Sequence, residues 1–319
     1  MTERLILDCD PGHDDALAMI LAAGDPRVEL LAVTTCAGNQ TLEKVTRNAL
    51  AVCAVAGIDV PVAAGARGPL VRPQLVAPEI HGESGLDGPV LPEAVRALDP
   101  RHAVDLIIDV VLAEEPGTVT LVPTGPLTNI ALAMRKEPRI VDRVKRVVLM
   151  GGSYTRGNKT PAAEFNIAAD PEAAQAVFAG RWPVTMVGLD LTHQATADAD
   201  VVARIKAIGS PLSAFVVDVL GFFGRTYRQQ QGFDAPPVHD LCCVAYLCDP
   251  AVFTTRDAFV AVELTGTWTA GMTVTDFGDL LGQPHNTDVA VALDKPRLWD
   301  MTVQAITALS AVPAEVAAR

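Results

Sequence analysis

Short apolar runs and longer periodic stretches alternate along the chain. Runs rich in β-branched and aliphatic residues predict strands, whereas apolar residues that recur every three or four positions predict helices. The predicted strands lie at Leu5–Leu7, Val28–Thr35, Val119–Val122, Val147–Met150 and Val184–Leu189. Because helical stretches separate them, we expect an open, mostly parallel sheet with helices on both faces, which is an α/β fold.

Helices are predicted for residues 42–56, 103–113, 127–134 and 210–231, and another begins at Asp170. Residues 65–92 are rich in Pro and Gly, and they predict a long loop of the kind that is often functional. The chain shows no internal repeat and no charged linker. We therefore expect a single domain, residues 1–319, whose strand ends converge on one site.

Composition and charge narrow the classes of partner. Of 319 residues, 50% are hydrophobic, and 25 Lys and Arg against 38 Asp and Glu give a net charge of −13. An acidic chain without a dense basic run is a poor nucleic-acid binder, and no apolar run predicts a membrane span. No leader is expected, and the six cysteines, which form no C-x-x-C pair, predict reduced, buried thiols in a cytoplasmic protein.

The densest polar cluster stands near the start, in the run LILDCDPGHDDALAMI, which holds Asp8, Asp10, Asp14 and Asp15. The pattern predicts a strand, a tight turn and a helix, so these carboxylates gather where open α/β sheets bind ligands. Like charges this close favour a hard divalent cation. Simple helix capping is the alternative. An EF-hand is excluded because its sixth position requires Gly and here is His13.

Three further clusters carry candidate chemistry. The turn within 122–129 exposes carbonyls that suit a hard cation, although it could be a plain strand-to-helix turn. Residues 158–166 combine a carboxylate with two amides, which suits several hydroxyl groups, although a solvated loop has a similar composition. His239 and Asp240 precede an apolar stretch, where the alternative is a helix cap with an incidental His. His81 lies in the long loop and could belong to a lid.

Together these segments resemble the nucleoside hydrolases, especially the inosine–uridine and pyrimidine-preferring members. The similarity rests on DCDPGHDDA at the start, AGN at 37–39, IHGESGLDGP at 80–89, VPTGPLTN at 122–129, LMGG at 149–152, EFN at 164–166 and PVHD at 237–240. The resemblance implies a single Rossmann-like α/β domain that holds Ca²⁺ and hydrolyses the N-glycosidic bond of ribonucleosides in nucleoside salvage. It also implies a homodimer or homotetramer.

The resemblance assigns roles to individual residues. The implied Ca²⁺ ligands are Asp10, Asp15, the carbonyl of Thr124 and Asp240. The residues implied to bind ribose are Asp14, Asn39, the Met150 backbone, Asn158, Glu164 and Asn166. His81 and His239 are implied to face the base.

The implied reaction passes through an oxocarbenium-like transition state, which carboxylates favour electrostatically. Bound calcium would orient a water beneath the anomeric carbon and lower its pKa for attack. Asp10 is the candidate base for that water, and His239 is the candidate acid for the departing base. Polar groups built for the ribose hydroxyls should reject 2′-deoxy substrates.

Base preference depends on the helix at 210–231. Phe223, Tyr227 and Gln231 share one face and could contact a base, although Phe223 could equally pack into the core. In pyrimidine-preferring members a Gln precedes a Tyr by one turn, and here the order is reversed. We expect uridine and cytidine as substrates and leave inosine open. The rival functions are a metal-dependent phosphatase with Asp8 or Asp10 as nucleophile, and a non-catalytic nucleoside- or ribose-binding protein.

Overall fold

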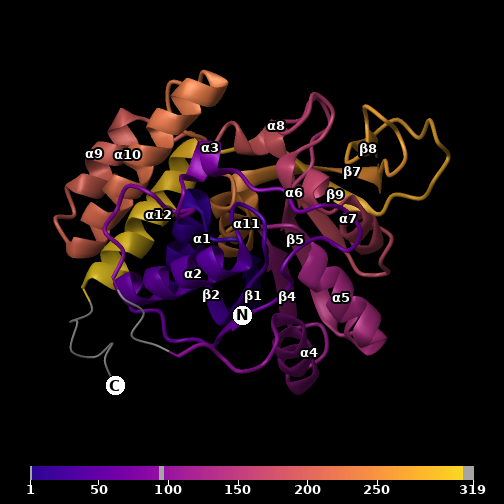
Figure 1. The fold of residues 1–319 in the computed structure, drawn as a ribbon, viewed down its shortest axis with the longest axis horizontal. Helices are drawn as coiled ribbons and strands as arrows, with labels where there is room; N and C mark the ends of the chain where they lie inside the picture. The colour runs from indigo at the N-terminus through magenta and orange to yellow at the C-terminus, as the bar shows by residue number, and fades with distance from the viewer. Residues whose placement is uncertain (1, 93–96, 312–319) are drawn as a thin grey trace.

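The computed structural model describes residues 2–92 and 97–311. Within them a nine-stranded sheet runs in the order β3-β2-β1-β4-β5-β6-β9-β7-β8 (Figure 1). The parallel strands are β1 (Glu3–Cys9), β2 (Val28–Thr35), β3 (Val62–Ala64), β4 (Val119–Pro123), β5 (Val144–Met150), β6 (Val184–Val187) and β9 (Thr287–Leu293). The sheet and its helices form a single α/β domain, as the sequence pattern predicted.

The strand order reverses between β1 and β4. The chain proceeds from β1 outward to β2 and β3, then returns to pair β4 with the other side of β1. In open α/β sheets the loops diverge at such a switch point and leave a crevice at the carboxyl ends of the strands. Asp10 follows β1 and Thr124 follows β4, so both lie at this crevice.

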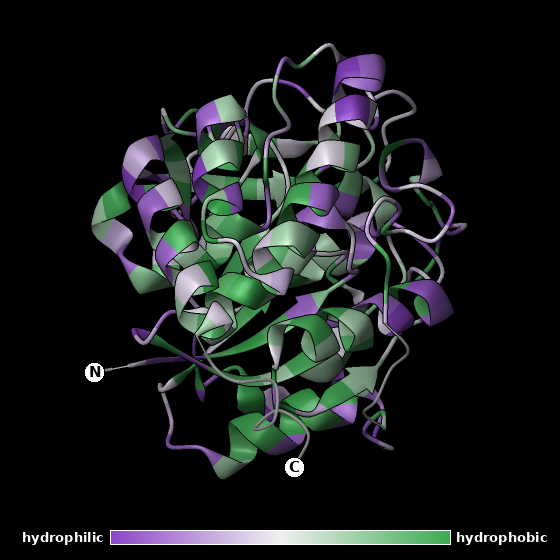
Figure 2. Ribbon diagram, turned by 90° about the vertical axis from the view of Figure 1, so that its left-hand side faces the viewer, coloured by the Kyte–Doolittle hydropathy of each residue, from purple (hydrophilic) through white to green (hydrophobic). Residues whose placement is uncertain are grey.

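Helices cover both faces of the sheet because its central strands are apolar on both sides. Along β1, Leu5 and Leu7 enter one core cluster, and Ile6 enters the other. The first cluster packs beneath α1 (His13–Gly24), α2 (Leu42–Ala56), α10 (Pro211–Gln231), α11 (Leu241–Cys248) and α12 (Lys295–Ser310). The second packs beneath α4 (Ala103–Ala113), α5 (Thr128–Lys136) and α7 (Pro171–Phe178). Figure 2 shows this hydrophobic interior in green.

The helix that follows β1 positions the acidic cluster. Its apolar sequence buries α1 against α11 and α12, and the backbone N–H of Gly12 donates to Asp15 Oδ2 at 3.0 Å. Asp14 and Asp15 therefore occupy the first turn, where the positive end of the helix dipole favours carboxylates. Packing thus fixes both side chains at the crevice before any ligand binds.

The structure differs from the sequence expectations in several places. The segment 65–92 is not wholly irregular, because it contains the short helix α3 (Pro78–His81). The residues 164–166 do not form a loop: Glu164 caps α6 (Phe165–Ala169), which is too short for a periodic signal. The antiparallel strands β7 (Phe253–Val262) and β8 (Thr273–Asp276) were not predicted, and neither were β3, β9 and α12.

In the described chain, two further helices and two 3₁₀ turns connect these elements. The short helices are α8 (Leu189–Thr192) and α9 (Ala199–Lys206), and single 3₁₀ turns span Pro138–Ile140 and Pro250–Val252. All six cysteines are buried, as expected. Among the described residues, no helix has both the length and the apolar character that crossing a bilayer requires.

Candidate active site

A cavity of about 220 Å³ opens at the carboxyl ends of β1, β4 and β5. The residues proposed from sequence that line it are Asp14, Asn39, His81, Thr124, Met150, Asn158, Glu164, Asn166, Tyr227, Gln231, His239 and Asp240. Three other proposed residues, Asp10, Asp15 and Phe223, are not among the residues that line it. The cavity also includes Ala77, Glu79, Ile80, Lys159, Phe165 and Gln230, none of which was proposed as a site residue from the sequence.

The floor of the cavity is acidic. Asp14, Asp15 and Asp240 each present a carboxylate oxygen, and these atoms all lie within 4.8 Å of one another. Burial, together with the charge of Asp15, raises the pKa of Asp14 to about 7. Burial and the neighbouring aspartates also raise the pKa of Asp240 well above its ordinary value. Such a group of buried carboxylates is stabilised by a bound metal ion.

Asp10 stands beside this group in a close-fitting turn. Its Oδ2 accepts a hydrogen bond from the Asn39 backbone N–H at 2.6 Å, whereas its buried Oδ1 has no hydrogen-bond partner within the described chain. A Cβ on Gly38 would lie 2.0 Å from Oδ2, and one on Gly125 would lie 2.6 Å from Oδ1. The two glycines therefore let the backbone approach this carboxylate, and its unpartnered oxygen fits a metal ligand or a proton acceptor.

The other candidate ligands are held by side-chain hydrogen bonds. The Thr124 hydroxyl donates to Asp15 Oδ1 at 2.8 Å. The Thr124 carbonyl accepts from Asn166 Nδ2 at 2.7 Å, and the same amide donates to the Met150 carbonyl at 3.1 Å. A carbonyl oxygen has a second lone pair, so Thr124 still fits as an oxygen ligand. Asn166 thereby ties the ends of β4 and β5 together at the floor.

Glu164 forms one wall. Its carboxylate accepts from the backbone N–H groups of Asn166 at 2.9 Å, Ile167 at 3.1 Å and Gly152 at 3.0 Å. Burial raises the pKa of Glu164 to about 7 against the opposing effect of these bonds. Nearby, Asn158 Oδ1 accepts from the Phe165 N–H at 2.9 Å. Both side chains are thus fixed in orientations suited to binding hydroxyl groups.

The opposite wall contains a chain of three polar side chains. Nδ1 of His239 lies 2.7 Å from the Thr192 hydroxyl, and Nε2 lies 2.7 Å from the Tyr227 hydroxyl. Burial lowers the pKa of His239 well below its ordinary value and raises the pKa of Tyr227. No sequence motif included Thr192, although the Thr192-His193 pair lies only a few residues beyond the 184–187 strand and could have drawn attention to it.

His81 lies on a third side of the cavity. Its Nδ1 is 3.1 Å from Nδ1 of His13, whose Nε2 is 2.8 Å from the Asp87 carbonyl. Phe223 does not line the cavity: it is 1% exposed, its ring stacks on that of His13 with centroids 5.1 Å apart, and it meets the Tyr227 ring edge-on at 4.7 Å. The core-packing interpretation of Phe223 fits this position, because its ring supports Tyr227 from behind.

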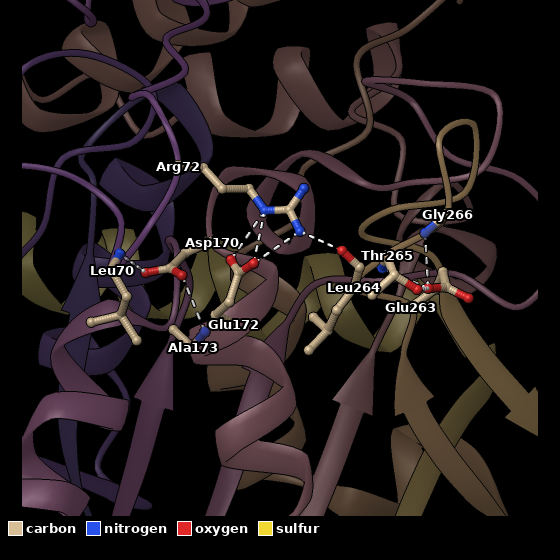
Figure 3. Close-up of polar contacts among 9 residues, drawn as sticks. All are labelled: Leu70, Arg72, Asp170, Glu172, Ala173, Glu263, Leu264, Thr265 and Gly266. Atoms are coloured by element: carbon tan, nitrogen blue, oxygen red, sulfur yellow. Dashed lines mark hydrogen bonds and ion pairs between the residues drawn. The ribbon is translucent and has the colours of Figure 1, made fainter.

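The 65–92 segment is attached near its start by a set of ion pairs and hydrogen bonds made by Leu70 and Arg72, which we call the polar clamp (Figure 3). No local sequence pattern predicts these contacts. Arg72 forms a bidentate ion pair with Glu172 and donates to the Leu264 carbonyl at 2.8 Å. The Leu70 N–H donates to Asp170 Oδ2 at 2.9 Å. Glu172 lies in α7 and Asp170 caps that helix, so the clamp joins the segment that carries α3 to the helices that follow Glu164.

Asp8 points away from the cavity. It is fully buried, its Oδ1 accepts from Thr34 Oγ1 at 2.6 Å and from Asn129 Nδ2 at 2.8 Å, and it does not line the cavity. Burial raises its pKa to about 7. This geometry supports a structural role for Asp8 and does not suit a phosphatase nucleophile.

Comparison with known proteins gives a consistent result. The family described as inosine-uridine preferring nucleoside hydrolase matches residues 5–300. The chain is 53% identical over 308 residues to an inosine-uridine preferring nucleoside hydrolase of Crithidia fasciculata, covering 96% of this chain and 98% of that protein. It is 46% identical to a pyrimidine-specific ribonucleoside hydrolase of Shigella flexneri, over 95% of this chain and 96% of that one. A purine-preferring ribonucleoside hydrolase from Gardnerella vaginalis has a similar structure, with a TM-score of 0.90, 34% identity, and coverage of 97% and 99%.

Proposed function

We propose that this chain, which belongs to the inosine-uridine preferring nucleoside hydrolase family, hydrolyses uridine, cytidine and inosine to ribose and free base with Ca²⁺ as its metal. Membership of the family makes it an N-glycosyl hydrolase of ribonucleosides. The observation that carries the finer proposal is the acidic floor, where Asp14, Asp15 and Asp240 converge beside the unpartnered Asp10 oxygen.

The donor set favours calcium. Asp10, Asp15, the Thr124 carbonyl and Asp240 would hold the ion, and all four offer oxygen atoms, which Ca²⁺ accepts in numbers of six to eight. When bound, Ca²⁺ supplies a Lewis acid that lowers the pKa of a water and accepts ribose hydroxyls. Asp14 lies in the same group of carboxylates, so it would bind a ribose hydroxyl next to the ion.

Asp10 is the proposed base. Its Oδ1 is buried and unpartnered among the described residues, so it is free to accept the proton of the attacking water. The ribose hydroxyls would bind to Asn39, Asn158, Glu164 and Asn166, and the Met150 backbone would contact the ring. The surrounding carboxylates would stabilise the positive charge that develops on the sugar.

The departing base would receive its proton from the wall that holds His239. The Tyr227 hydroxyl lines the cavity and contacts His239 Nε2, so the imidazolium form of His239 would donate a proton to the base directly or through that hydroxyl and return to the neutral form that burial favours. Thr192 at Nδ1 fixes the orientation of the imidazole ring. His81, Gln230 and Gln231 would contact the base. Among the described residues of α10 that line the cavity, Tyr227 is the one aromatic side chain on which a base could stack.

One assay tests the proposal. Purified protein is incubated with uridine, cytidine, inosine and 2′-deoxyuridine, with Ca²⁺ or with a chelator, and free ribose is measured. We expect ribose from the three ribonucleosides, loss of activity with the chelator and little turnover of the deoxy substrate. Binding without release of ribose would favour the nucleoside-binding alternative, and release of phosphate from phosphate esters would favour the phosphatase.

A further inference from the structure

An ion pair spans the mouth of the cavity. Glu79 Oε1 in α3 lies 3.4 Å from Nζ of Lys159, which belongs to the segment between β5 and α6. Their side chains are 46% and 27% exposed, and both residues line the cavity. Lys159 is the one Lys or Arg among the described lining residues, so its positive charge determines how strongly the mouth of the cavity attracts an anion.

The position of Lys159 relative to a substrate follows from the shape of ribose, and this step rests on the proposed function. The 2′,3′-diol would face the acidic floor, and the base at C1′ would face Tyr227 and His239. In a ribose ring C4′, which carries C5′, lies across the ring oxygen from C1′. The 5′-hydroxyl would therefore point toward the wall formed by Asn158 and Glu164. In the view of Figure 1, α10 and α6 lie to either side of α3.

This wall suits a neutral 5′ end. A hydroxyl can donate to the buried Glu164 carboxylate, whose other contacts are to backbone N–H groups. A 5′-phosphate would bring nearly two negative charges beside that carboxylate. Lys159, which directly follows Asn158, is the available counter-charge, but Glu79 is paired with it. A phosphate could recruit Lys159 only by leaving the Glu79 carboxylate unpaired at the same mouth.

We propose that Glu79 is a specificity-determining residue: by pairing with Lys159 it prevents that ammonium group from binding a 5′-phosphate, and it restricts the cavity to ribonucleosides over 5′-mononucleotides. Glu79 acts by charge at the rim, not at the glycosidic bond. Its removal should therefore alter the ratio of mononucleotide to nucleoside recognition through Lys159.

The test compares uridine with uridine 5′-monophosphate in four proteins: wild type, Glu79→Gln, the double variant Glu79→Gln with Lys159→Met, and Glu83→Gln. Glu83 is an exposed carboxylate of the same segment that does not line the cavity, so it is the matched control. For each protein kcat/KM is measured for both compounds at low ionic strength, because a half-exposed charge is screened by salt. If uridine is not turned over, Kd values for both compounds are measured by calorimetry with Ca²⁺ present.

We expect Glu79→Gln to raise the monophosphate-to-uridine ratio about tenfold or more, the double variant to return it toward wild type, and Glu83→Gln to leave it unchanged. An unchanged ratio in Glu79→Gln, or a rise that persists without Lys159, would overturn the proposal. Calorimetry gives the same ratio without turnover, so absence of uridine hydrolysis would refute the proposed function while the charge argument is still decided by the binding ratio.

Discussion

The floor of the cavity and the wall that holds His239 are both built from buried titratable groups, but they satisfy those groups in opposite ways. On the floor, three carboxylates converge within 4.8 Å, and one oxygen of the adjoining Asp10 is without a partner in the described chain. On the wall, both ring nitrogens of His239 already have hydroxyl partners at 2.7 Å. The floor is incomplete without a cation, whereas the wall is assembled in advance.

This difference separates two kinds of dependence. The carboxylates of the floor have raised pKa values, and protons and a cation compete for the same oxygens. The effect of the metal on the floor should therefore depend on pH. A wall whose hydrogen bonds are complete should respond to the leaving group instead, since its part is to deliver a proton late in the reaction. Variants of the two regions should therefore have different signatures.

The largest effect is expected on the floor. Asp10→Asn removes the proposed base and a metal ligand at once while preserving the shape that Gly38 and Gly125 enclose. We expect kcat for uridine to fall by roughly 10³-fold or more, since general base catalysis alone contributes about 10² to 10⁴. Asp8→Asn is the matched control, because Asp8 is a buried aspartate two residues before Asp10 that does not line the cavity. Its kcat should stay within about tenfold of wild type. Near-native turnover in Asp10→Asn would contradict the proposed role of Asp10 as base and metal ligand.

The next largest effect is expected on the wall. His239→Ala should lower turnover of uridine and inosine by about 10²-fold or more, and Tyr227→Phe should lower it by less, because His239 also lines the cavity. Both variants should retain most activity on p-nitrophenyl riboside, whose leaving group needs no proton. The comparison of kcat on the two substrates checks this. An equal loss on both substrates would indicate that the pair positions the sugar instead of supplying a proton.

Much of this architecture could be predicted from sequence because it depends on local patterns. The strands β1 and β4 are buried on both faces, so their apolar runs are uninterrupted, and the turns after them carry the polar motifs. The positions of Asp14 and Asp15 could be predicted for the same reason. Both lie in the first turn of the helix that follows β1, so the pattern alone places them at the end of that strand.

The features that escaped prediction depend on contacts distant in sequence or on mixed burial. In β7, buried and exposed positions alternate irregularly, and Arg256 and Asp257 interrupt the apolar pattern, so no strand was predicted there. The ion pairs of Glu79 with Lys159 and of Arg72 with Glu172 join residues 80 and 100 positions apart. Such pairs exist only once the sheet has brought two loops together, and no local periodicity records them.

The smallest expected effect is on thermal stability, and it compares the floor with the wall through the pH dependence of Tm. The folded pKa values of Asp14 and Glu164 are raised to about 7, above their unfolded values, so the metal-free native state binds extra protons between about pH 4 and 7. These groups contribute stability at the low end of that window and lose it as pH rises through the folded pKa. Burial also raises the pKa values of the proposed Ca²⁺ ligands Asp10, Asp15 and Asp240, and Ca²⁺ binding needs these carboxylates deprotonated, so its stabilisation should grow as pH rises. We expect the shift in Tm on adding Ca²⁺ to be several degrees larger at pH 7.5 than at pH 5.

The metal-free Tm alone would not isolate the floor, because the buried histidines act in the opposite sense. The pKa of His13 is lowered to about 4 and that of His239 well below 6.5, so these groups favour the folded state more as pH rises toward 6.5. Neither imidazole is a proposed ligand, so their contribution is the same with and without Ca²⁺ and is removed when the two Tm values are subtracted. A calcium-dependent shift of equal size at both pH values would mean that protons and calcium do not compete at the floor, and the contrast between the two regions would fail.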